Sequence, residues 1–139
     1  MNEITKVQSS RGLYAVLEPL IDREWENACV CLQLSRQLEG AAGQILHRLF
    51  EQEQAHCGCL RGICTVLTGE KLHLRPIAAA DGSREELLRG CYARQMRNLA
   101  AYEELARSGE HREVFSRLRD QEREHGRQLL LVLSGACPC

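Results

Sequence analysis

Four stretches of the chain carry apolar residues at the spacing of an amphipathic α-helix. The first runs from Leu17 to Leu38, the second from Leu46 to Leu67, the third from Leu88 to Tyr102 and the fourth from Val114 to Val132. Residues that favour helices (Leu, Ala, Arg, Glu and Gln) dominate, whereas proline occurs only 3 times. The pattern therefore predicts an all-α fold of four helices.

Residues with special backbone preferences predict where these helices begin and end. Pro19 predicts either a first turn or a kink in the first helix, because proline lacks a backbone N–H. Gly40 and Gly43 bracket a tight turn before the second helix. Ser83 and Glu86 have the spacing of a capping box, which predicts the start of the third helix. That helix is expected to end near residues 108–109.

Residues 69–83 show no helical period and form the longest connection. About 15 extended residues reach about 50 Å, whereas a helix of about 25 residues is about 37 Å long. This connection is therefore long enough to return along the whole bundle and to leave the second and third helices parallel. We expect one domain over residues 1–139, with a helical core over 11–134 and a short cysteine-containing tail over 135–139.

Composition excludes several classes of partner. The chain of 139 residues has a formal net charge of −1, which gives no reason to expect binding to nucleic acid or to an anionic membrane. No apolar run approaches the roughly 20 residues that span a bilayer, and the polar N-terminus lacks the apolar core of a signal peptide. We therefore expect a cytoplasmic protein whose 8 cysteines are reduced thiols.

Ionisable residues interrupt the apolar seams of three helices. Glu53 and His56 stand where leucine is expected in the second helix, and Glu122 and His125 repeat the same Glu-x-x-His spacing in the fourth. Glu24 lies in the seam of the first. Burying unpaired carboxylates costs several kcal/mol, so a partner is required. Metal ions are the natural partner where carboxylates and imidazoles converge.

The heights of these residues along the bundle agree. Each Glu-x-x-His pair begins about 13 residues after a predicted tight turn, and Glu24 and Gln95 lie about 16 and 14 residues before the same two turns. At about 1.5 Å per residue, all of them fall within one helical turn of the same level. A single Glu-x-x-His pair is usually a solvated surface pair, but two pairs in register with apolar seams favour a metal centre.

This arrangement resembles the ferritin-like superfamily, and most closely its rubrerythrin branch, over about residues 11–134. Members carry a glutamate on helix one, Glu-x-x-His on helices two and four, and another glutamate on helix three. The resemblance implies a ferritin-like four-helix bundle with a long crossover between helices two and three. It also implies a set of metal ligands, in which Gln95 stands at the place of the helix-three glutamate: Glu24, Glu53, His56, Gln95, Glu122 and His125.

The resemblance further implies iron-dependent redox chemistry, namely oxidation of ferrous iron or reduction of peroxide. Glu53 and Glu122 would bridge or bind the metal, each histidine would hold one metal ion, and Glu24 would cap one side. Tyr102, in the segment Gln95-x6-Tyr102, would donate a hydrogen bond to the cluster and counts as the catalytic candidate. Iron is the expected cofactor, as a pair or a single ion, with zinc and manganese as alternatives. A homodimer is also expected, and the electron donor is not identified.

Gln95 leaves two interpretations open. With a glutamine there, only three carboxylates face two divalent cations, which leaves one positive charge uncompensated. The chain is then either a di-iron oxidoreductase or a non-catalytic metal-binding, assembly or sensing module with one metal or none. Cys91, one turn away, is a further candidate ligand, although a small core residue is the simpler interpretation. A third hypothesis is a thiol-based metal carrier that uses Cys137 and Cys139 of the tail.

Overall fold

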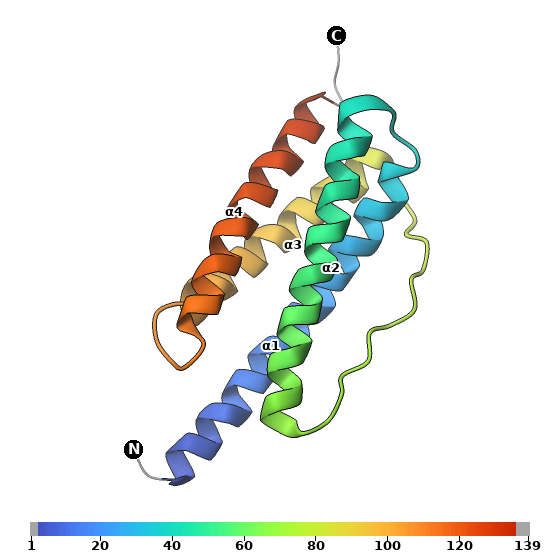
Figure 1. Cartoon of the computed structure of the whole chain (residues 1–139). Coiled ribbons are helices and arrows are strands. Elements are labelled where there is room, and N and C mark those ends of the chain that lie inside the picture. Colours follow the sequence, from blue (N-terminus) through green and yellow to red (C-terminus); the bar gives the residue numbers. More distant parts are fainter. Residues whose placement is uncertain (1–2, 136–139) are drawn as a thin grey trace.

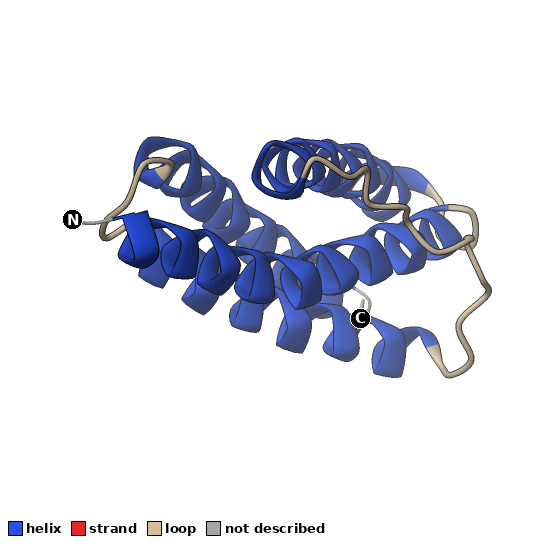
Figure 2. Ribbon diagram, turned by 90° about the horizontal axis from the view of Figure 1, so that it is seen from below, coloured by secondary structure: helices blue, strands red, loops and turns tan. Residues whose placement is uncertain are grey.

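The computed structural model of the chain describes residues 3–135, with side chains from residue 11 onward, and they form four α-helices joined by loops (Figure 1). The helices are α1 (Glu3–Ser35), α2 (Gly40–Thr68), α3 (Arg84–Leu105) and α4 (Arg112–Gly135). Over this described range Figure 2 shows only helices and loops, which confirms the all-α prediction. None of these helices is both long and apolar enough to cross a membrane.

The helices form a ring in which each contacts two others. α1 packs on α2 and α3 packs on α4 as antiparallel hairpins, and the two hairpins meet through α1 with α3 and α2 with α4. The segment 69–83 leaves the end of α2 and runs along the outside of the bundle to the start of α3 (Figure 1). α2 and α3 are therefore parallel, and the predicted long crossover is confirmed.

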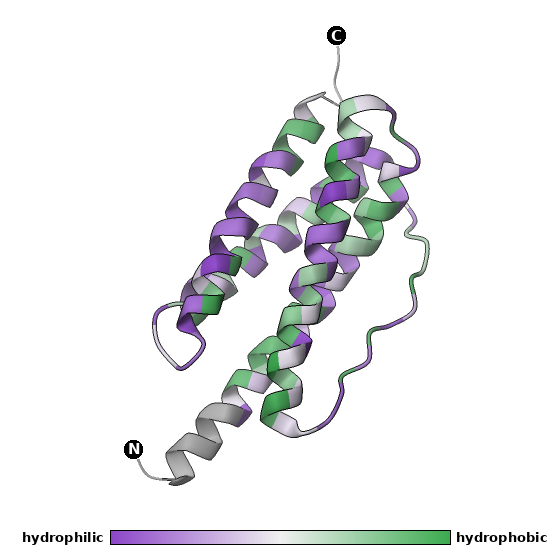
Figure 3. Cartoon of the chain, in the orientation of Figure 1, coloured by the Kyte–Doolittle hydropathy of each residue, from purple (hydrophilic) through white to green (hydrophobic). Residues whose placement is uncertain are grey.

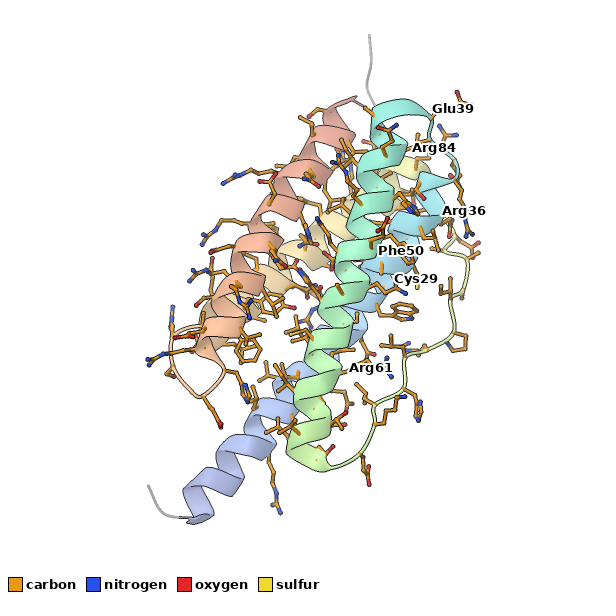
Figure 4. The ribbon with its side chains drawn as sticks, viewed as in Figure 1. Cys29, Arg36, Glu39, Phe50, Arg61 and Arg84 are labelled. Carbon is orange, nitrogen blue, oxygen red and sulfur yellow. The ribbon has the colours of Figure 1, made fainter. Side chains whose placement is uncertain are left out.

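Polar side chains of α1 and α2 hold the crossover against the bundle. Arg61 of α2, labelled in Figure 4, donates from Nε to the backbone oxygen of Leu72 at 2.7 Å. Gln33 of α1 bonds the backbone of Ala80 in both directions, donating at 2.9 Å and accepting at 2.8 Å. These bonds satisfy backbone groups of a segment that has no secondary structure of its own.

The helix ends follow the sequence signals in part. Ser83 caps α3, since its Oγ accepts a hydrogen bond from the backbone N–H of Glu86 at 3.1 Å. Gly69 ends α2 in a left-handed conformation, with φ of 75°, and its N–H donates to the oxygen of Thr65. Pro19 lies inside α1, which begins at Glu3, so the expectation of a first turn there is wrong.

The buried side chains form two apolar clusters that are separated by a polar layer. Figure 3 shows polar and apolar residues alternating along the helices, as amphipathic packing requires. One cluster includes Leu17, Leu60, Tyr102 and Phe115. The other includes Leu34, Leu46, Leu88 and Leu129. Between them, the described helices bury eight polar or charged residues, at matching levels: Glu24, Asn27, Glu53, His56, Gln95, Asn98, Glu122 and His125.

Gly43 of α2 packs directly against the backbone of the turn that joins α1 to α2. It was expected at the turn but lies inside α2, where an added Cβ would sit 2.2 Å from the backbone oxygen of Leu38. We predict that Gly43→Ala lowers the free energy of unfolding by about 1–3 kcal/mol, because backbone atoms cannot yield as side chains do. Urea denaturation measures this effect.

Gly58, in the same helix, supplies the matched control because nothing lies within 4 Å of its added Cβ. Gly58→Ala should raise the free energy of unfolding by up to about 1 kcal/mol, the usual helix-propensity gain. Equal stabilities of the two variants would show that the turn is not packed as described.

Candidate metal centre

Two Glu-x-x-His pairs meet at the centre of the polar layer. Glu53 and His56 come from α2, and Glu122 and His125 come from α4. One ligand atom from each of the four lies within 4.8 Å of all the others. Each side chain is at most 3% exposed. The seams thus bring these four residues together in the interior, as the heptad positions predicted.

Glu24 of α1 joins this group through His56. The Nδ1 atom of His56 lies 3.1 Å from Oε2 of Glu24 and 2.8 Å from Oε1 of Glu122. On the other side, Nδ1 of His125 bonds Oε1 of Glu53. The two imidazole rings stack with their centroids 5.2 Å apart and an interplanar angle of 21°. Both Nδ1 atoms therefore face carboxyl groups inside the bundle.

The Nε2 atoms of the two histidines point the other way, to glutamines on the opposite helix. Nε2 of His56 donates to Oε1 of Gln121 at 2.5 Å, and Nε2 of His125 donates to Oε1 of Gln52 at 2.7 Å. A histidine that ligates a metal through one nitrogen nearly always donates the other N–H to an oxygen, which fixes its tautomer and ring orientation. The structure provides that partner for both rings.

Gln52 and Gln121 were missed by the sequence analysis. Both are exposed, so they lie outside the apolar seams on which that analysis relied. Their signal was nevertheless present, since a glutamine precedes each Glu-x-x-His pair, in Gln52-Glu53 and Gln121-Glu122.

Gln95 lies in the polar layer but binds neighbours other than the histidines. Its Oε1 accepts a hydrogen bond from Nδ2 of Asn27 at 3.2 Å, and its Nε2 donates to the backbone oxygen of Glu122 at 3.2 Å. Asn98 occupies the corresponding position toward Glu24 and donates from Nδ2 to Oε1 at 2.6 Å. The two asparagines were also missed, although Asn27 follows Glu24 and Asn98 follows Gln95 at the same spacing of three residues.

Three buried side-chain oxygens in the described part of the chain have no hydrogen-bond partner: Oε2 of Glu53, Oε2 of Glu122 and the hydroxyl of Tyr102. Leaving such an atom unsatisfied costs about 1–3 kcal/mol. A cation between the two helices would satisfy both carboxylate oxygens. Tyr102 is fully buried, and the nearby carboxylates add to the effect of burial in raising its pKa. The residues present thus fit a bound cation.

Glu24 and His56 form an ion pair in the absence of metal. Burial opposes the charged form of Glu24, but hydrogen bonds with neighbouring carboxyl groups and His56 outweigh it and lower the pKa of Glu24 to about 2. Burial alone would lower the pKa of His56, yet its hydrogen bonds with Glu122 and Glu24 raise that pKa to about 10. At neutral pH Glu24 is therefore ionised and His56 is a cation that donates from both ring nitrogens.

The other half of the cluster is neutral. Burial, followed by the charges of Glu122 and Glu24, raises the pKa of Glu53 well above its usual range. Burial and the charge of Glu24 also raise the pKa of Glu122. Burial and the positive charge of His56 lower the pKa of His125 to about 4. The protonated carboxyl of Glu53 thus donates to Nδ1 of neutral His125.

The cysteines within residues 11–135 take no part in this cluster. Cys91 is buried in an apolar cluster, where its Sγ accepts a hydrogen bond from Nη2 of Arg94 at 3.6 Å. Within the described residues, the one group with metal-ligand spacing contains only the glutamates and histidines above. Cys137 and Cys139, the proposed carrier thiols, lie outside the described residues.

No protein-family model, curated protein or solved structure matches this chain. Its function is therefore argued from the donor set and from the hydrogen bonds that surround it.

Proton release should accompany metal binding, because the cation competes with protons held by the cluster. His56 is protonated at pH 7 and must lose its Nδ1 proton to become a ligand, and the raised carboxyl pKa values add further protons. We predict that Mn²⁺ binding releases one or more protons and that affinity rises from pH 6 to pH 8, by about tenfold per pH unit for each proton. Titration calorimetry in buffers of different ionisation enthalpy measures the release. Binding that is independent of pH and buffer would contradict the assignment of protons.

Proposed function

We propose that this protein is a rubrerythrin-like metal-binding protein whose buried glutamates and histidines hold divalent iron. The observation that carries the proposal is the pair of unsatisfied carboxylate oxygens, on Glu53 and Glu122, in a cluster where two histidines also turn Nδ1 inward. A dry bundle has no other reason to place these groups together, because aliphatic side chains would pack there at lower cost.

The chemistry of the donors narrows the choice of metal. Calcium and magnesium favour sites built only from oxygen, and soft cations favour thiolates. This cluster offers carboxylate oxygens together with two imidazole nitrogens and no thiolate. Such a set suits iron, with manganese and zinc as the alternatives to be tested. Three carboxylates on α1, α2 and α4 would offset most of the charge of the bound cations.

The proposed activity is oxidation of ferrous iron or reduction of peroxide, for which bound iron would supply the electron transfer. The chain's own residues would orient the ligands and manage protons. Gln121 and Gln52 hold the two imidazole rings. The raised pKa values of Glu53 and Glu122 favour uptake of protons by their carboxyl groups when positive charge leaves the site. The buried hydroxyl of Tyr102 is free to donate a hydrogen bond toward the carboxylates.

A second candidate function is a non-catalytic metal-binding, assembly or sensing module. The observation that favours it is the amide of Gln95, which supplies an N–H donor where the rubrerythrin pattern has a fourth carboxylate. Elemental analysis of protein purified without a metal-affinity tag separates the two candidates. Two irons per chain, with visible absorption that develops in air, would favour the redox protein. One zinc per chain, or no metal, would favour the module.

The double variant Glu53→Gln, Glu122→Gln separates metal binding from folding. Because both carboxyl groups have raised pKa values, an amide is close to the protonated form that the metal-free protein buries. We predict that the variant keeps the metal-free unfolding free energy within about 1 kcal/mol of the parent but weakens Fe²⁺ or Mn²⁺ binding by about tenfold or more. Urea denaturation and titration calorimetry give the two values.

The control is the double variant His47→Gln, Glu51→Gln. This pair lies on the same helix α2 with its side chains 3.0 Å apart, but both are more than half exposed. Its removal should leave metal binding unchanged. Equal loss of binding in both double variants would place the metal elsewhere and refute the proposed site.

A further inference from the structure

The segments 23–27 of α1 and 94–98 of α3 share a sequence pattern that the metal ligands alone do not explain. Each reads Arg, then Glu or Gln, then two other residues, then Asn. In the bundle each asparagine reaches across to the other helix, and each arginine does the same. The result is two hydrogen-bonded chains with the same order of residues, one ending on Glu24 and the other on Gln95.

The first chain ends on Glu24. Nε of Arg23 donates to Oδ1 of Asn98 at 2.7 Å, and Nδ2 of Asn98 donates to Oε1 of Glu24 at 2.6 Å. Asn98 is fully buried. Asn98 therefore fixes Oε1 of Glu24, and the other carboxylate oxygen, Oε2, faces Nδ1 of His56 at 3.1 Å.

The second chain ends on Gln95. Nε of Arg94 donates to Oδ1 of Asn27 at 2.7 Å, and Nδ2 of Asn27 donates to Oε1 of Gln95 at 3.2 Å. Nδ2 of Asn27 also lies 3.2 Å from the backbone oxygen of Cys91, a second acceptor. The remaining group of Gln95, its NH₂, donates to the backbone oxygen of Glu122.

Donor and acceptor chemistry determines the direction of both chains. A guanidinium group only donates, so each asparagine must turn its oxygen to arginine and its NH₂ to the next residue. That residue must then present an oxygen. For Glu24 this leaves a second carboxylate oxygen for a cation, whereas for Gln95 it leaves an NH₂ group, which has no lone pair to offer.

We infer that Arg23 and Asn98 position Glu24 as a metal ligand, and that Arg94 and Asn27 hold Gln95 as a hydrogen-bond donor, so that the cluster takes one cation, on the side of Glu24 and His56. The inference rests on the metal binding proposed above, and it favours a single ion over a pair. It adds two residues, Arg23 and Asn98, that position the ligand Glu24. It also assigns Arg94 and Asn27 to holding Gln95 outside the ligand set, which sets the stoichiometry at one cation.

Asn98→Leu and Asn27→Leu form a matched pair of variants. Both asparagines are buried, both accept from Nε of an arginine, and both substitutions remove that acceptor. We expect the parent to bind one Co²⁺ per chain. Asn98→Leu should weaken that binding by about 10- to 100-fold and alter the visible absorption of bound Co²⁺, whereas Asn27→Leu should stay within about threefold of the parent.

The outcomes separate this inference from the proposed function. A parent that binds no Co²⁺ overturns both. A parent that binds Co²⁺ with equal losses in the two asparagine variants overturns only the inference, since the asparagines would then serve folding alone. If either asparagine variant fails to fold, Arg23→Met and Arg94→Met give the same comparison, because both arginine side chains reach the surface in part. Equal losses in the arginine pair would again overturn the inference.

Gln95→Glu tests the second chain directly. Asn27 already turns an NH₂ group toward residue 95, so a carboxylate would meet a donor there, and its second oxygen would replace the NH₂ of Gln95. We expect this variant to bind two Co²⁺ per chain instead of one, measured by elemental analysis after gel filtration. A count that stays at one, in a folded variant, would show that Gln95 is not what limits the site.

Discussion

The structure depends on the burial of ionisable side chains halfway along an otherwise apolar bundle. Three glutamates and two histidines lie at this level with almost no exposure, and each charged group there requires a compensating partner. Glu24 and His56 compensate each other as an ion pair, whereas burial raises the pKa of Glu53 and of Glu122 and favours their neutral forms. The metal-free layer thus remains near neutrality while the lone pairs that a cation needs stay in place.

The two helical hairpins repeat the same polar residues, and the differences between the repeats account for the asymmetry of this layer. The Gln-Glu-x-x-His segments of α2 and α4 are equivalent, and the glutamine of each segment accepts a hydrogen bond from the histidine of the other. The segments on α1 and α3 are equivalent in their arginine and asparagine but differ where Glu24 corresponds to Gln95. This one difference places an N–H donor where Glu24 has a carboxylate oxygen, and it is the basis of our inference that one half of the cluster is the stronger cation site.

Much of this arrangement could be predicted from the sequence, because apolar periodicity and loop length carry the fold. The seams located Glu53, His56, Glu122 and His125, and the long segment 69–83 indicated the crossover. The start of α1 at Glu3 was not found, because the apolar seam begins only at Leu17 and Pro19 allowed either a first turn or a kink. Residues outside the seams could not be assigned, because their roles depend on which atom faces which across two helices.

The glutamines and asparagines that bond the site residues could be found in the sequence only as residues that recur in both halves of the chain. A glutamine before each Glu-x-x-His pair and an asparagine three residues after Glu24 and Gln95 recur at a separation of about 70 residues. Comparing the two halves residue by residue, instead of asking only which positions are apolar, would have identified them as candidates. Their donors and acceptors, however, are defined only once the helices are placed side by side.

Anomalous X-ray diffraction from crystals soaked in Fe²⁺ or Mn²⁺ at neutral pH would locate a cation bound inside the bundle. The account predicts a peak between α2 and α4, within coordination distance of Nδ1 of His56 and of the carboxylates of Glu24 and Glu122. A peak at the protein surface, or no peak inside the bundle in crystals soaked at neutral pH, would contradict it.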